Sequence, residues 1–136
     1  MFFNKKKEKN IKSHFVKIGA LLIHAAKIDE NYSIEEEEII KKTLLNLGAD
    51  KDKLKNIIIE SKQSEENANQ ILDFTKEIKN LQENDKIKII KSLWKIIYSN
   101  KNADVYETNL MRRLTGLLYI DSKIVGDIKE KIKNEN

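Results

Sequence analysis

Apolar residues recur along this chain at alternating steps of three and four, which is the spacing of one face of an α-helix. The first such segment runs from about Ile11 to Ala26 and contains "IGALLIHAA", a patch that is apolar on nearly every side. We therefore expect a central, mostly buried helix there. No stretch alternates with the two-residue period of a strand for long enough to indicate one. The pattern predicts an all-α fold.

Six further helices are predicted, and most of them begin directly after a side chain that can cap a helix. The predicted segments are 34–47, 51–62, about 65–81, 85–99, 105–118 and 122–133, and the caps are Ser33, Asp50, Ser64, Asp104 and Asp121. Gly48 follows the second helix, where a residue of positive φ commonly ends a helix. The expected architecture is a compact bundle of about seven helices joined by short turns.

The first helix and its successor have an echo later in the chain. A shift of 71 positions aligns apolar with apolar and polar with polar residues. The aligned pairs include Ile18–Ile89, Leu22–Leu93, Ala25–Ile96, Asp29–Asn100, Ser33–Asp104, Glu36–Glu107 and Ile40–Met111. We expect two helix-turn-helix copies that pack against each other around a pseudo-twofold axis.

Composition narrows the class of protein further. The chain has 136 residues, no cysteine, no proline, four glycines and a formal net charge of +4. Thiol chemistry and disulfides are thereby excluded, and the mild basicity does not predict a nucleic-acid partner. We expect one domain over residues 11–133, preceded by a flexible basic arm at residues 1–10. The expected location is the cytoplasm.

The stretch "KIDENYSIEEEEII" raises the question of a metal site. An EF-hand loop starting at Asp29 would need glycine at its sixth position and glutamate at its twelfth, but Ile34 and Ile40 stand there. Ser33 and Glu36 instead have the spacing of a capping box, and Asp104 and Glu107 repeat it. Lysines one turn beyond the other glutamates predict the ion pairs Glu37–Lys41 and Glu38–Lys42.

The pattern predicts that Asp29, unlike the other acidic residues of this stretch, does not lie fully on the surface. It continues the apolar row of the first helix by one more step of four, so a partly buried carboxylate is expected. Such a group needs donors, a cation or a metal.

The sequence contains no catalytic motif and no phosphate-binding glycine loop, so we expect no enzyme and no catalytic residue. His14 and His24 lie on one helix, and His24 is interpreted as a hydrogen-bonded interior side chain. The aromatic residues expected in the core are Phe15, Phe74, Trp94, Tyr98, Tyr106 and Tyr119. Arg112, Arg113 and the lysines of the third and fifth helices are expected on solvated faces.

Two parts of the chain resemble the tellurite-resistance TerB-like family, which also includes the N-terminal domain of a membrane-anchored DnaJ-like co-chaperone. The resemblance extends from about Val16 to Ile128. The residues that match its motifs are Ala26, Asp29, Tyr32 and Glu36 in the first copy, and Tyr98, Ala103, Glu107, Leu110, Arg112 and Arg113 in the second. Three family positions differ, with Glu30 and Lys101 in place of glycines and Asn100 in place of an aspartate.

The resemblance implies an all-helical, non-catalytic module of the stress or tellurite response that binds protein partners, some of them at membranes. It also implies a divalent cation held by acidic residues, which here map onto Asp29, Glu36 and Glu107. A purely structural capping role for these three residues is the competing interpretation. An alternative function is peripheral membrane docking through the basic residues of segment 1–12 at the inner face of the membrane.

Overall fold

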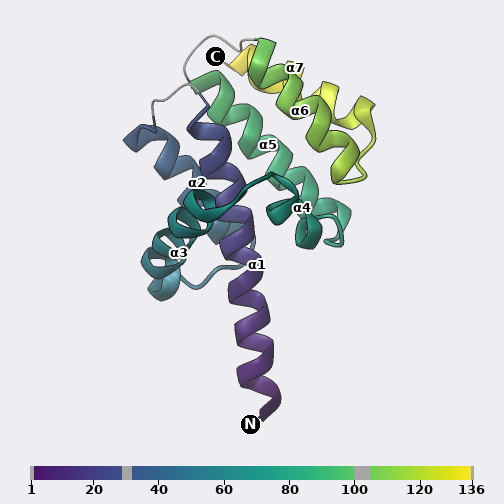
Figure 1. Cartoon of the computed structure of the whole chain (residues 1–136). Coiled ribbons are helices and arrows are strands. Elements are labelled where there is room, and N and C mark those ends of the chain that lie inside the picture. Colours follow the sequence, from purple (N-terminus) through teal and green to yellow (C-terminus); the bar gives the residue numbers. More distant parts are fainter. Residues whose placement is uncertain (1, 29–31, 100–104, 136) are drawn as a thin grey trace.

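The computed structural model describes residues 2–28, 32–99 and 105–135, with side chains placed for 14–28, 32–99 and 108–135. The described segments are helices and turns without strands, which confirms the predicted all-α fold (Figure 1). The helices are α1 (Phe2–Ala26), α2 (Ile34–Asn46), α3 (Leu54–Asn67), α4 (Leu72–Ile78), α5 (Glu83–Ser99), α6 (Val105–Leu117) and α7 (Ser122–Glu135), and a 3₁₀ turn, η1 (Lys51–Lys53), precedes α3.

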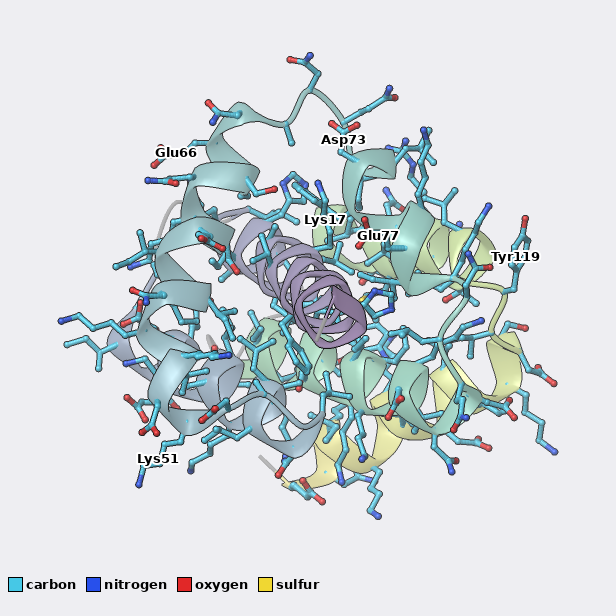
Figure 2. All side chains as sticks on the ribbon, turned by 90° about the horizontal axis from the view of Figure 1, so that it is seen from below. Lys17, Lys51, Glu66, Asp73, Glu77 and Tyr119 are labelled. Carbon is cyan, nitrogen blue, oxygen red and sulfur yellow. The ribbon has the colours of Figure 1, made fainter. Side chains whose placement is uncertain are left out.

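Helix α1 is the centre of the bundle. Every residue from Ile18 to Ala26 is buried except His24, as the apolar patch predicts. The helix packs against α2, α3, α4 and α5. In the view along its axis, α1 lies in the middle and the other helices surround it (Figure 2). The apolar surface of this segment is therefore covered by neighbouring helices, and His24 marks its one partly exposed side.

Gly19 sets the close approach of α1 to α3. A Cβ atom at this position would lie 2.9 Å from Cβ of Ser61 and still closer to its hydroxyl. Ser61 cannot swing away freely, because it is fully buried and its hydroxyl donates to the Ile57 carbonyl at 2.7 Å. The contact between the two helices therefore requires glycine on α1.

Helix α5 forms the second buried element. Its core side chains come from two adjacent rows, so the helix packs on α1 and α2 with one side and on α7 with another. These buried residues are Ile89, Leu93 and Ile96 in one row and Ile90, Trp94 and Ile97 in the other. Both members of the pairs Ile18–Ile89, Leu22–Leu93, Ala25–Ile96 and Ile40–Met111 are buried. The pseudo-twofold relation between the copies stays a prediction.

The helix boundaries agree with the capping residues in α2, which ends before Gly48 at φ +105°. Several boundaries were predicted wrongly, and α4 covers only Leu72–Ile78 of the helix expected over about 65–81. Helix α1 begins at Phe2 rather than Ile11, and its N-terminal part extends away from the bundle in Figure 1. Helix α3 continues to Asn67, so no helix starts at Glu65. The predicted flexibility of residues 1–10 stays a prediction.

The break between α3 and α4 has a local cause. Asn67 and Asn69 flank Ala68, which adopts an extended conformation at φ −81° and ψ 137°. Asparagine side chains compete for backbone hydrogen bonds and favour turns over helix interiors. The turn at these residues therefore separates α3 from α4, which begins only at Leu72.

The burial of two side chains was predicted wrongly. Tyr119 was expected in the core but is 75% exposed, because it ends α6 with a left-handed backbone at φ 55° and points outward (Figure 2). Lys86 was expected on a solvated face but is only 9% exposed. Its ammonium group donates at 2.8 Å to the Leu118 carbonyl, just past the end of α6, where a helix leaves acceptors unpaired. Tyr106 lies outside the side chains that the structure describes, and the other predicted core aromatics are buried or partly buried.

No helix in the described segments is long and apolar enough to cross a membrane.

Candidate functional site

The acidic start of α2 is built on a capping box. The Ser33 hydroxyl accepts from the Glu36 amide at 3.1 Å, and the Glu36 carboxylate accepts from the Ser33 amide at 3.0 Å. This reciprocal pair confirms the sequence prediction. The Glu36 side chain is fully buried. A carboxylate thus lies inside the protein at the positive end of a helix, where backbone amides stabilise its charge.

Glu37 joins the start of α2 to α3. Its carboxylate accepts from the Tyr32 hydroxyl at 3.2 Å and from the Lys62 ammonium at 2.9 Å. The Lys62 ammonium also lies 5.5 Å from the centre of the Tyr32 ring. The hydrogen bond from Lys62 holds the pKa of Glu37 below its ordinary value, and burial raises the pKa of Tyr32. These three side chains form one network.

Glu65 makes the corresponding connection between α3 and the end of α1. Its two oxygens lie 3.4 Å from Nδ1 of His24 and 2.8 Å from Nζ of Lys27. The hydrogen bond to Glu65 raises the pKa of Lys27. The hydrogen-bonded role predicted for His24 is confirmed, but its interior position is wrong, because its side chain is 39% exposed.

His24 also lines a cavity of about 400 Å³. The other lining residues are Ile28, Asn69, Gln70, Ile71, Asn109, Leu110 and Arg113. The lining is rich in amides because Asn69 and Gln70 lie in the break between α3 and α4. This cavity is not predicted by the sequence pattern, which indicates a continuous helix through Asn69 and Gln70. The cavity places Leu110 and Arg113, which match motif positions of the TerB-like family, in the same lining as His24.

The residues predicted to hold a metal are only partly placed. Glu36 is buried at the start of α2, whereas Asp29 and the side chain of Glu107 lie outside the described residues. Within the described residues, no three His, Asp or Glu side chains are grouped as a metal site would require. The set Asp29, Glu36 and Glu107 therefore stays a prediction.

The predicted ion pairs on α2 are also only partly formed. Lys41 lies 3.9 Å from both Glu37 and Glu38, so the Glu37–Lys41 pair is confirmed. The prediction of a Glu38–Lys42 pair is wrong. Glu38 pairs instead with Lys41, three positions further along α2, and Lys42 lines a groove beside α5.

The site as a whole joins the end of α1, the start of α2 and the length of α3. Its contacts are a capping box and two carboxylates, Glu37 and Glu65, that each bind a lysine from a different helix. Such contacts fix the ends of the segment between α1 and α2.

This fold and site define an all-helical domain with a polar junction at the end of its central helix. Comparison with known protein families gives its class: a family model described as tellurite resistance protein TerB matches residues 16–130. The chain therefore belongs to the TerB family, as the resemblance implied. No curated protein and no solved structure matches the chain.

The Glu37 network predicts a specific loss of stability in acid. Because the pKa of Glu37 is lower in the folded than in the unfolded protein, its contribution is complete above the ordinary value of 4.5 and is lost as the pH falls through the folded value. Glu37→Gln should lower the free energy of unfolding by less than about 1 kcal/mol at neutral pH, because the pair is partly solvated.

Urea denaturation from pH 7 to pH 3 measures this difference, which should shrink toward zero in acid. Glu38→Gln is the matched control, because that carboxylate is 58% exposed. A difference for Glu37→Gln that is independent of pH, or equal to that of the control, would contradict the network.

Proposed function

We propose that this TerB-family domain is a non-catalytic module of the stress or tellurite response and that it acts by binding a protein partner. The family membership supports the class of module. The observation that carries the binding role is an apolar side chain left in solvent at the start of α2: Ile34 is 82% exposed beside the buried Glu36.

The outer face of α2 extends this surface. Leu45 is 38% exposed and lies about three helical turns after Ile34, so the two side chains project from the same side of the helix. Glu38 and Lys41 stand between them on that side and form an ion pair at 3.9 Å. An apolar contact at each end with charges between them is the composition of a small protein-binding surface, where anchors supply affinity and charges supply orientation.

The inner contacts of α2 keep this face in place. The Ser33–Glu36 capping box fixes its first turn, and the bonds from Glu37 hold the same turn against α3. A partner therefore meets a preordered helix and does not have to order it on binding, which lowers the entropic cost of association.

The second part of the proposal is a divalent cation held by Asp29, Glu36 and Glu107. Carboxylate oxygens are the ligands that Mg²⁺ and Ca²⁺ prefer. Membership of the TerB family, onto whose acidic motif positions these three residues map, supports the proposal. The ion would stabilise the junction of the two predicted repeats, next to the partner-binding face.

Site-specific crosslinking tests the partner-binding face. A photoreactive amino acid at Ile34 should give a defined crosslinked protein in living cells, and the same amino acid at Lys53, which is exposed on η1, should not. A distant Leu45→Ser substitution should weaken the crosslink severalfold, because it removes the second apolar contact.

Equal products from the two positions would contradict the proposal. The alternative function, membrane docking through residues 1–12, has a different signature. In that case, removing residues 1–12 would abolish association with anionic liposomes, and substitutions at Ile34 and Leu45 would leave the cellular association of the protein unchanged.

Calorimetry tests the cation. Millimolar Mg²⁺, Mn²⁺ or Ca²⁺ should raise the melting temperature, since a ligand at a hundred times its Kd stabilises the folded state by about 2.7 kcal/mol. Asp29→Asn should abolish the increase. Glu35→Gln, which removes an exposed carboxylate from the same helix start, should leave it intact. An unchanged melting temperature with each of these ions and with Zn²⁺ would leave only the capping role.

A further inference from the structure

A groove between α2 and α5 is lined by lysines, in contrast to the glutamate-rich start of α2. It has a volume of about 490 Å³ and lies between one row of residues on each helix. The lining residues are Ile39, Lys42, Thr43 and Asn46 from α2 and Lys88, Lys91, Ser92 and Lys95 from α5. Half of them are lysines and none is acidic.

The two rows run in opposite directions. Thr43 and Ser92 meet in the middle through a hydrogen bond between their hydroxyl groups, and Nζ of Lys88 reaches the Asn46 carbonyl at 3.4 Å at one end. Each row covers positions i, i+3, i+4 and i+7, so it follows one helix face for about 10 Å. Lys42 and Lys91 are then near the middle, and Lys95 lies toward the end that Ile39 marks.

The floor of the groove fixes the spacing between these lysines. Thr43 and Ser92 are both buried, and the Thr43 hydroxyl donates to the Ile39 carbonyl at 2.8 Å. Ser92 is thus left to donate to Thr43, so the Ser92 hydroxyl proton bonds across the two helices and the Thr43 proton bonds within α2. The helices are held together at this point, while the lysine side chains remain above the floor.

The groove lysines lack acidic partners in the part of the chain that the structure describes. The lysines that form ion pairs there are Lys27, Lys41 and Lys62, and none of the four groove lysines does so. Elsewhere on α2, glutamates and lysines do pair. Four ammonium groups that share one concave surface without counter-charges create a local positive potential that favours anions.

We propose that this groove binds a compact polyanion that carries several phosphate groups. Lysine binds phosphate as a point charge, and a row of lysines can follow linked phosphates without needing one exact orientation. The volume falls within the range of about 300–1,000 Å³ that is typical of small-ligand sites.

Two other kinds of anionic partner fit the groove less well. A docked acidic helix would need apolar anchors, but Ile39 is the only large apolar residue in the lining. A nucleic-acid strand would need aromatic stacking platforms or a longer basic track, and the lining contains no aromatic side chain. The proposal is independent of partner binding through Ile34 and of the proposed cation, because neither involves a residue of the groove lining.

Titration calorimetry with sodium tripolyphosphate tests the groove. The wild-type chain should bind the probe, and the affinity should fall as salt is added. Lys91→Gln/Lys95→Gln should weaken binding about tenfold or more, because it removes two charged hydrogen-bond donors. Lys51→Gln/Lys55→Gln removes the same charge from exposed positions away from the groove and should change the affinity less than about twofold.

Vesicles that contain a phosphorylated inositol lipid distinguish a membrane headgroup from a free ligand. If they, and not tripolyphosphate, bind in a manner that depends on Lys91 and Lys95, the phosphate source is lipid and the groove is still the site. Absence of binding to both probes, or equal losses in the two double variants, would overturn the proposal. Circular dichroism of both variants checks that they remain folded.

Discussion

The close contact between α1 and α3 is the constraint on which the rest of the structure depends. Between Ile18 and Ala26, helix α1 is apolar on every side except that of His24, so it reaches its stable state only when other helices cover its apolar sides. Gly19 allows α3 to approach closely enough to do so. Helices α2, α4 and α5 also pack against α1, and Figure 2 shows them arranged around it.

The polar surfaces follow from this arrangement. Because α3 lies against α1, Glu65 reaches His24 and Lys27, and Lys62 reaches Glu37 at the start of α2. Because α5 lies against both α1 and α2, the lysine rows of α2 and α5 face one groove. Helix α2 thus separates two surfaces of different character: an apolar and acidic one near Ile34, and a basic one near Lys42. The two proposed binding functions therefore use different faces of one helix.

Local sequence signals predicted much of the fold but only part of the site. Ser33, Glu36 and Gly48 act within a few residues of themselves, so the ends of α2 were correctly predicted, and the apolar patch correctly predicted a buried α1. The bonds of Glu65 to α1 and of Lys62 to Glu37 link residues 25 to 41 positions apart, so they depend on packing that no local pattern encodes. The environments of Tyr119 and Lys86 were also predicted wrongly. Tyr119 is exposed because it follows the end of α6 with a left-handed backbone. Lys86 is buried because its ammonium group binds the carbonyl of Leu118.

Substitution of the glycine at the α1–α3 contact is the most direct test of this account. Overpacking in Gly19→Ala should lower the free energy of unfolding by roughly 1–3 kcal/mol. The higher helix propensity of alanine offsets this loss by up to about 1 kcal/mol. Gly126→Ala in α7, where an added Cβ meets nothing within 4 Å, should instead stabilise the protein. Urea denaturation of both variants gives the comparison. A Gly19→Ala protein as stable as Gly126→Ala would contradict the central role of the α1–α3 contact.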